Sequence, residues 1–441
     1  MTPLPPGPKL PKSLQTLLIG FAWDRWLHDC QRRYGDVFTI RAIPFGTIVY
    51  FADPAAIKEI FTTDARTMHA GESNEVLKPV LGEQSVLVTD EADHLRRRKA
   101  MLPHFHGDAV RTYAELIEQL AEDELDSWPL GRPMELHPRM RALTFEVILR
   151  AVFGVSDAAR MTEMRAALPE LVELSGPLML MFAWPQLGRV GPWRRWSALK
   201  QRADALVVDE IERRRAVGDL DERTDILSLL LRGGMDDTEE LRDQLVTLLL
   251  AGHETTATAL AWAFERLMRT PLAYERATAA AREGDDAYLD AVAQEALRVR
   301  PVIFDVVRKL NQPATIGGLD LPAGVLVAPG IGLVHRDPRR YPQPRAFRPE
   351  RFLEEGVPAP YTWIPFGGGV RRCLGAAFAQ TEMRVVLRTV LRRARLRAPS
   401  LAPERARTRH ITLVPARGAR AIVESRGARE RQPDRERALV A

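Results

Sequence analysis

The stretch PFGGGVRRCLGAAFA, residues 365–379, places one of the only two cysteines of the chain behind a run of glycines and arginines. Glycines lack a Cβ, so residues 367–369 let the backbone turn tightly and approach a flat ligand closely. Residues 374–384 favour a helix, which puts Cys373 at or just before a helix N-terminus. Backbone N–H groups, the helix dipole and the two preceding arginines favour a thiolate there and lower the thiol pKa. The thiolate could serve as a nucleophile or a metal ligand; a small buried cysteine before an ordinary helix is the alternative.

Five residues of this stretch stand at the spacing F-x-x-G-x-R-x-C-x-G, namely Phe366, Gly369, Arg371, Cys373 and Gly375. This spacing resembles the haem-ligand loop of the cytochrome P450 family. The resemblance implies that Cys373 is the thiolate ligand of the iron in haem b. It also implies that Arg371 binds a haem propionate and that Phe366 packs beside the sulfur.

A long helix is expected over residues 235–267, which begin with cap-like residues and continue with an apolar stripe of leucines. Its middle is unusual, because Gly252 costs about 1 kcal/mol relative to alanine in a helix interior. Glu254 and Thr255 also place polar groups among apolar ones. Taken alone, the glycine serves packing and the threonine bonds its own helix backbone.

The same segment, AGHETT from Ala251 to Thr256, resembles the oxygen-binding stretch A/G-G-x-D/E-T-T/S of that family. The resemblance implies that Ala251 and Gly252 lie against the haem, where the glycine opens a groove. It also implies that Glu254 and Thr255 are the acid–alcohol pair that delivers protons to dioxygen. Such a pair makes chemical sense, because heterolytic cleavage of an O–O bond needs two protons in a dry site.

A second helix, YLDAVAQEALRVRP, carries Glu295 and Arg298 three residues apart, so that they can form an ion pair. An E-x-x-R pair is common by itself. At this position before the cysteine loop it resembles the structural E-x-x-R of the family. In FRPERF downstream, either Arg348 or Arg351 could complete a salt-bridge triad that holds the cysteine loop. A buried charge that loses its partner is costly, so disrupting the triad is expected to impair haem incorporation.

Two further places suit haem carboxylates. His94 and Arg98 are one helical turn apart and share a face. Taken alone they belong to a solvated basic helix; beside a haem loop they resemble the propionate clamp H-x-x-x-R of the family. Arg308, seven residues after Pro301, matches an arginine that the family directs at a propionate.

The resemblance also places the substrate pocket. It implies lining residues between 66 and 88, around 177–184, near Ala251, near 412–413, and at Val302, Ile303, Phe304 and Asp305. The apolar stretch 176–184 suits a mouth that admits lipophilic molecules, or an ordinary helix core. Asp305 is polar among apolar neighbours and either orients a substrate group or faces away.

Composition places the chain among globular proteins. It has 441 residues, of which 46% are hydrophobic and 27% charged, with a formal net charge of +5. Its many arginines suit a solvated, salt-bridged surface, so we expect no nucleic-acid partner. Two cysteines cannot build a disulfide framework or a four-cysteine metal site. No apolar run reaches the ~18 residues of a membrane span, so we expect a cytoplasmic protein without a transmembrane anchor.

The pattern along the chain predicts a mainly α fold with small β-sheets, built as one large domain. Residues 36–54 are expected to form two short strands, and residues 309–330 a second β region. We divide the chain into a proline-rich arm (1–20), a main domain (21–425) and a charged, disordered tail (426–441). The resemblance implies the cytochrome P450 fold, with haem buried between two long helices.

The expected activity is that of a haem monooxygenase acting on a lipophilic small molecule such as a fatty acid, a terpenoid or a steroid. Electrons would come from a separate ferredoxin or flavodoxin, and we expect a monomer. The acidic partner is expected to dock on the cysteine side, at a set of basic residues: Arg96, Arg97, Lys99 and Arg372. A peroxygenase driven by hydrogen peroxide and a haem-binding sensor or carrier without turnover are the alternatives; the acid–alcohol pair counts against both.

Overall fold

The computed structural model describes residues 3–155, 157–172, 191–353, 358–409 and 411–429. Its helices are α1 (Lys12–Tyr34), α2 (Pro54–Thr62), α3 (Lys78–Leu81), α4 (Glu91–Met101), α5 (Asp108–Arg111), α6 (Ala114–Asp126), α7 (Leu136–Phe153), α8 (Ala158–Val172), α10 (Gly191–Ala216), α11 (Ile226–Arg232), α12 (Thr238–Leu267), α13 (Pro271–Glu283), α14 (Asp286–Val299), α15 (Ile331–His335) and α16 (Ala376–Arg393). Its strands are β1 (Val37–Ala42), β2 (Gly46–Phe51), β3 (Met68–His69), β4 (Pro133–Glu135), β5 (Arg308–Leu310), β6 (Ala314–Ile316), β7 (Leu319–Leu321), β8 (Leu326–Pro329), β9 (Ala394–Arg397), β10 (Ala406–Arg409), β11 (Thr412–Pro415) and β12 (Arg420–Arg426).

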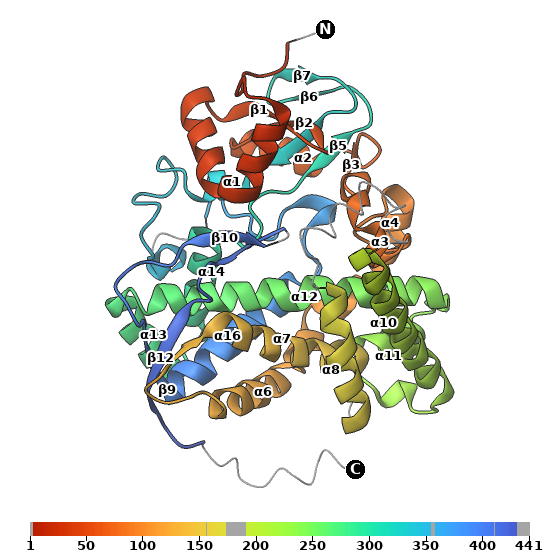
Figure 1. Ribbon diagram of the computed structural model, residues 1–441, viewed down its shortest axis with the longest axis vertical. Helices are drawn as coiled ribbons and strands as arrows, with labels where there is room; N and C mark the ends of the chain where they lie inside the picture. The colour runs from red at the N-terminus through yellow and green to blue at the C-terminus, as the bar shows by residue number, and fades with distance from the viewer. Residues whose placement is uncertain (1–2, 156, 173–190, 354–357, 410, 430–441) are drawn as a thin grey trace.

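Helix α12 crosses the middle of the molecule and separates two regions (Figure 1). On one side lies a sheet in the order β1-β2-β8-β5-β3, together with α1 and α2. On the other side lie α6, α7, α8 and α16 (Figure 1). Strands β1 and β2 form the predicted antiparallel hairpin, and β2 pairs in parallel with β8 from the second predicted β region. The prediction of a mainly α fold with small sheets in one domain is confirmed.

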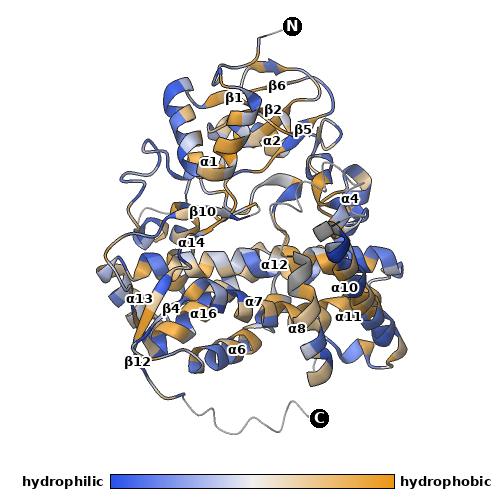
Figure 2. Ribbon diagram, viewed as in Figure 1, coloured by the Kyte–Doolittle hydropathy of each residue, from blue (hydrophilic) through white to orange (hydrophobic). Residues whose placement is uncertain are grey.

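The central position of α12 follows from its sequence. The Asp237 carboxylate caps the helix by accepting a hydrogen bond from the N–H of Glu240 at 2.6 Å. Leu241, Leu245 and Leu249 are completely buried, as the leucine stripe predicts. The helix contacts α7, α14 and α16, so it is covered on several sides. Figure 2 shows hydrophobic colouring along the helices that surround it. None of the described helices combines the length and the apolar character needed to span a bilayer.

The chain ends differ in part from the proposed division. Helix α1 starts at Lys12, inside the range assigned to the arm, so the extended segment ends at Pro11. This is consistent with the sequence, because the last of the closely spaced prolines is at position 11. Strand β12 reaches Arg426. Most of the predicted tail, residues 430–441, and the apolar stretch 176–184 lie outside the described residues.

Candidate functional site

The cysteine loop is held between α2 and the start of α16. Gly369 has a φ of +64°, and a Cβ at this position would lie 1.9 Å from the Phe61 carbonyl oxygen. The N–H of Cys373 donates a hydrogen bond of 2.9 Å to the Phe366 carbonyl, which closes the loop. Gly375 is the N-cap of α16. The cysteine therefore stands just before a helix N-terminus, where the sequence placed it.

The predicted direction of the Cys373 pKa is wrong for the polypeptide alone. Burial raises the pKa of this thiol, while the Gly375 backbone N–H and the guanidinium groups of Arg98 and Arg372 lower it by a smaller amount. The helix N-terminus and the arginines thus act as predicted, but desolvation by the surrounding protein atoms outweighs them, although Cys373 as a whole residue is exposed. A coordinated metal cation deprotonates a thiol outright, so the site suits a metal ligand better than a free thiolate.

Four basic side chains from three elements meet beside this loop. Burial and then the guanidinium groups of Arg371 and Arg98 lower the pKa of His94 to about 3, so its imidazole is neutral at physiological pH. Burial and Arg371 likewise lower the pKa of Arg308 to about 10. Helix α4 supplies His94 and Arg98, β5 begins with Arg308, and the cysteine loop contributes Arg371. The fold therefore brings together all four predicted propionate-binding residues.

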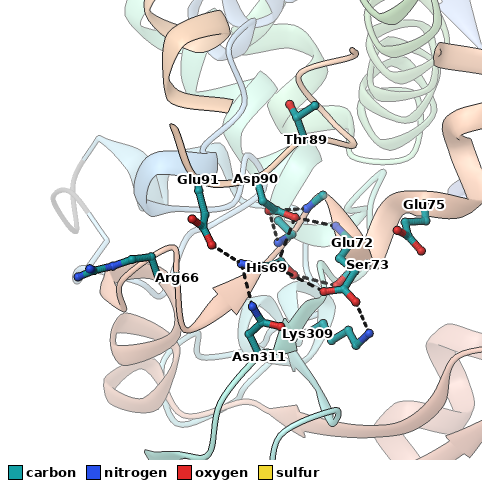
Figure 3. A network of polar contacts seen from close by, with 12 residues as sticks. Arg66, His69, Glu72, Ser73, Glu75, Thr89, Asp90, Glu91, Lys309 and Asn311 are labelled. Atoms are coloured by element: carbon teal, nitrogen blue, oxygen red, sulfur yellow. Dashed lines mark hydrogen bonds and ion pairs between the residues drawn. The ribbon is translucent and has the colours of Figure 1, made fainter. Parts of the chain in front are cut away.

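One carboxylate lies within this cluster. Asp90 forms an ion pair with Arg371, which also donates a hydrogen bond of 2.6 Å to the Thr89 carbonyl. Figure 3 shows the Asp90 carboxylate turned toward the backbone of the segment after β3, where it accepts the N–H groups of Ala70 and Gly71 at 2.9 and 2.8 Å. Asp90 was not among the residues predicted from the sequence, although an aspartate that directly precedes a basic helix is a visible signal.

The charge balance of the cluster tests whether haem fits here. Among the described residues, neither Arg98 nor Arg308 forms an ion pair with a carboxylate. Three guanidinium groups and one carboxylate, Asp90, leave two positive charges in excess in a partly desolvated site. Buried charge of one sign is costly unless a counter-charge is present. A group with two carboxylates, such as haem, fits this excess.

Replacing Gly369 by alanine is expected to displace the cysteine loop, because the new Cβ overlaps a backbone carbonyl that cannot move aside and φ is positive. We expect loss of most haem incorporation, measured as the ratio of Soret to protein absorbance. Gly284→Ala, at the C-cap of α13 and outside the cysteine loop, is the matched control: its φ is also positive, at +77°, but its Cβ would meet nothing within 4 Å. That variant should lose only about 1 kcal/mol of stability. Equal loss in both variants would show that steric contact with Phe61 is unimportant.

The acid–alcohol pair lies at mid-α12, and its two members point to different partners. The Thr255 hydroxyl donates a hydrogen bond of 2.6 Å to the Ala251 carbonyl, which is the backbone-bonding alternative of the sequence analysis. The Glu254 carboxylate pairs with Arg141 of α7 at 2.6 Å and approaches His137 Nε2 at 3.5 Å. Ala251 is exposed in the middle of the helix, although His253 beside it is buried. The open side of α12 therefore begins at Ala251.

Gly252 serves packing. A Cβ at this position would lie 2.6 Å from Cδ1 of Ile148 on α7. The absence of a side chain therefore lets α12 and α7 approach closely, as the sequence alone suggested for this residue. A groove beside the haem stays a prediction from the resemblance.

The E-x-x-R pair is completely buried. Nε of Arg298 lies 2.6 Å from Oε2 of Glu295. The remaining N–H groups of Arg298 donate to carbonyls of the 335–346 segment, at 2.8 Å to His335 and 2.9 Å to Pro344. Between the two candidate third arginines, Arg351 contributes its side chain, with Nε 3.5 Å from Oε1 of Glu295.

Arg348 contributes differently, because its backbone N–H donates to Oε1 of Glu295 at 2.9 Å. Glu295 therefore accepts groups from both ends of the FRPERF segment. The pair ties α14 to the chain that leads into the cysteine loop, which agrees with a structural role.

The predicted pocket segment 302–305 divides between two cores. Val302 packs with the helical core, and its carbonyl accepts the N–H of Leu413 at 2.9 Å, so the 302 and 412–413 segments are neighbours; that they line the pocket stays a prediction. Ile303 and Phe304 pack instead with the sheet core, where the Phe304 ring lies 6.2 Å from that of Trp23.

The Asp305 side chain, like that of Phe304, points toward the sheet. Its carboxylate accepts a hydrogen bond of 2.7 Å from the Tyr50 hydroxyl on β2. Burial raises the pKa of Asp305 to about 7. A buried carboxyl needs a polar partner, and the sheet supplies one. The structure therefore favours the alternative in which Asp305 faces away from the substrate, and it corrects the pocket assignment of Phe304 and Asp305.

A buried acid that the sequence analysis did not single out lies on α16. Burial raises the pKa of Glu382 to about 8, and the Thr256 hydroxyl of α12 opposes this shift. The side chain is completely buried. The Glu382 carboxyl is therefore neutral at pH 7. It lies where α16, the helix that follows the cysteine, faces α12, the helix that carries Glu254 and Thr255.

The raised pKa of Glu382 predicts a pH-dependent stability. The folded state holds a proton that the unfolded chain releases above its ordinary pKa near 4.5, so stability falls as the pH rises from about 5 to 8. Glu382→Gln, which cannot titrate, should remove up to about 1.4 kcal/mol per pH unit of this fall. Denaturant unfolding at several pH values measures it. The exposed Glu283→Gln serves as control and should leave the slope unchanged; an unchanged slope in Glu382→Gln would contradict the assignment.

Comparison with known proteins agrees with this geometry. The cytochrome P450 family model matches residues 5–420. Cytochrome P450 135B1 of Mycobacterium tuberculosis is 46% identical over 433 residues, which cover 96% of this chain and 92% of the relative. Cytochrome P450 135A1 of the same organism is 43% identical over 427 residues, covering 95% and 94%. A retinoic acid-bound cyanobacterial CYP120A1 superposes with a TM-score of 0.82 at 24% identity, covering 96% of this chain and all of that one.

Proposed function

The chain belongs to the cytochrome P450 family and is a haem-thiolate monooxygenase, and from this premise we propose that it oxidises a lipophilic small molecule with electrons from a ferredoxin or flavodoxin. The observation that carries the proposal is the convergence of Cys373 with the propionate cluster from α4, β5 and the cysteine loop. A fatty acid, a terpenoid or a steroid is the proposed substrate class.

The chain supplies a ligand and an anchor for haem b. Cys373 would provide the axial thiolate, and Arg98, Arg308 and Arg371 would bind the two propionates, with neutral His94 as a further hydrogen-bonding group. When bound, haem supplies the iron centre at which dioxygen is activated. The glycines of the loop let the backbone approach the macrocycle, and the start of α16 holds the sulfur in place.

The acid–alcohol pair would handle protons. Arg141, the partner of Glu254, lines a surface cleft of about 620 Å³. This cleft supports a route by which Glu254 takes protons from solvent and passes them toward the Thr255 hydroxyl. For that step Glu254 must turn from Arg141 toward Thr255. Burial and Arg141 lower the pKa of His137 to about 3, so this imidazole adds no positive charge to the route.

One comparison separates the monooxygenase from a peroxygenase. Product formation with dioxygen, NADPH, a ferredoxin and its reductase should far exceed that with hydrogen peroxide alone, because the pair is placed to supply protons. The reverse ranking would favour the peroxygenase. Absence of NADPH consumption with every redox partner and lipophilic ligand would favour a sensor or carrier. Substrates would be found by screening lipophilic compounds for the spin-state shift of the Soret band.

One of the four basic residues predicted to dock the redox partner, Arg97, does not lie on the surface. Arg97 is buried, with Nε 2.9 Å from the Glu240 carboxylate, so it cannot meet a partner. Helix periodicity explains the difference, because Arg97 lies three residues from His94 on the inward face of α4. Arg96 is half-exposed but also pairs with Glu240, at 2.7 Å. Lys99 and Arg372 remain as exposed cations beside the cysteine loop.

Lys99→Glu is therefore expected to slow the first electron transfer from an acidic ferredoxin by about tenfold at low ionic strength. The physical reason is weaker attraction between oppositely charged faces. Added salt should therefore slow electron transfer to the wild type and narrow the difference in rate between the wild type and Lys99→Glu. Stopped-flow reduction measures both. Arg282→Glu on α13 reverses an exposed charge at another place and should leave the rate unchanged. A salt-independent rate in the wild type would rule out docking by charge.

A further inference from the structure

The first half of α1 exposes an apolar stripe. Leu14, Leu17 and Phe21 are spaced by three and four residues, so they share one face of the helix. All three are exposed, Leu17 by 55% and Phe21 by 87%. Scattered apolar residues are common on protein surfaces, but a row of them along one helix face marks an interaction surface.

The turn between β1 and β2 extends this stripe. Ile43 and Phe45 at its tip are both exposed. The N–H of Ile43 donates a hydrogen bond of 2.9 Å to the Thr16 hydroxyl, which fixes the turn against α1. Figure 1 shows α1 and β1 together at the N-terminal end of the molecule. We call the combined surface, Leu14, Leu17, Phe21, Ile43 and Phe45, the N-terminal apolar face.

The two chain segments that form the N-terminal apolar face carry charges of a single sign. Residues 3–23 and 37–52 contain no aspartate or glutamate. Their cations are Lys9, Lys12 and Arg41, all exposed. Within the described part of the chain none of the three takes part in an ion pair. These segments therefore place beside the apolar surface cations that pair with no acidic group among the described residues.

We propose that the N-terminal apolar face binds the surface of an anionic lipid bilayer, with α1 lying along the interface. A helix with leucine and phenylalanine on one face and lysines beside it inserts its apolar side chains between headgroups, while the lysines meet lipid phosphates. A second copy of this chain fits less well, because self-association would bring Lys9, Lys12 and Arg41 of both copies together without an acid between them. The N-terminal apolar face lies on the sheet side of the fold. Binding through this face places the proposed monooxygenase activity at a membrane surface.

Sedimentation of the purified, haem-loaded chain with lipid vesicles tests this proposal. Binding is expected to vesicles that contain phosphatidylglycerol and to be much weaker with phosphatidylcholine alone. Phe21→Glu should lower the vesicle partition coefficient by about tenfold or more, because a carboxylate would replace the aromatic ring that enters the bilayer. Lys12→Glu should lower it by about fivefold or more and reduce its salt dependence.

Two variants on α13 are the matched controls. Leu272 is 88% exposed, close to the 87% of Phe21, and Arg282 is an exposed cation on the same helix. Leu272→Glu and Arg282→Glu should leave vesicle binding unchanged. All variants are first checked for an unchanged melting temperature and an unchanged reduced-CO spectrum, so that loss of binding is not loss of fold.

Three results would overturn the proposal. They are equal binding to both kinds of vesicle or to neither, an equal effect of Leu272→Glu and Phe21→Glu, and a dimer in solution that Phe21→Glu converts to a monomer. Vesicle binding is measured without turnover, so its failure would leave the monooxygenase function untouched.

Discussion

Cys373→Ala should abolish the red-shifted Soret band that the reduced protein forms with carbon monoxide. The shift requires a thiolate ligand on the iron, and alanine has no atom that can replace the sulfur. Cys373 is the cysteine whose backbone the loop fixes at the start of α16, through its hydrogen bond to the Phe366 carbonyl. We therefore expect a complete loss of the band and of monooxygenase activity, measured by difference spectroscopy and by product formation.

The second cysteine provides the control. Cys30 lies in α1, buried in the sheet core, and burial raises the pKa of its thiol to about 11. Cys30→Ala should keep the full spectrum, with at most a modest loss of stability from the small cavity. A normal spectrum in Cys373→Ala, or a loss confined to Cys30→Ala, would refute the assignment of the ligand.

Glu295→Gln should lower the free energy of unfolding by about 3–5 kcal/mol, because it leaves the buried guanidinium groups of Arg298 and Arg351 without their carboxylate. Both members of the 2.6 Å pair are completely inaccessible to solvent. Arg298 also holds three carbonyls between residues 335 and 346, so the chain that leads to the cysteine loop should loosen. Denaturant unfolding and haem content measure the two consequences.

An ion pair on the surface serves as the control, because it has the same charges as the Glu295–Arg298 pair but is exposed to solvent. Glu275 and Arg395 form an ion pair of 2.7 Å in which both side chains are more than half exposed. Glu275→Gln should change neither stability nor haem content measurably, because exposed pairs contribute little. If the two substitutions had similar effects, burial of the Glu295 pair would not be the source of its importance. Arg298→Lys should also fail to restore haem content, because a lysine cannot reach three carbonyls at once.

Local sequence was sufficient for the elements and for the order of the motifs. The N-cap and leucine stripe of α12, the β1–β2 hairpin and the position of Cys373 before α16 depend on neighbouring residues, and the structure has them as predicted. The family spacing then connected the cysteine to haem. These features can be predicted from the sequence alone because capping, turn formation and helix periodicity act over a few residues.

Other properties depended on segments that are distant in the chain. The pKa of Cys373 was predicted to fall and instead rises, because burial outweighs the helix terminus and the arginines. It was likewise open in the sequence that Glu295 meets Nε of Arg351 and the backbone N–H of Arg348. Neither result follows from spacing, since both depend on which atoms from distant parts of the chain surround the group.

The sequence by itself determined the fold class and the family and predicted Cys373 as the haem ligand, because short-range patterns and a rare spacing carry that information. Only the tertiary structure decided that Arg97 points inward to Glu240, that Asp305 faces Tyr50, and that Glu382 is a buried neutral acid. It also brought α1 and the β1–β2 turn into one apolar face. The physical reason is that desolvation and pairing of a side chain are set by whatever long-range packing places around it.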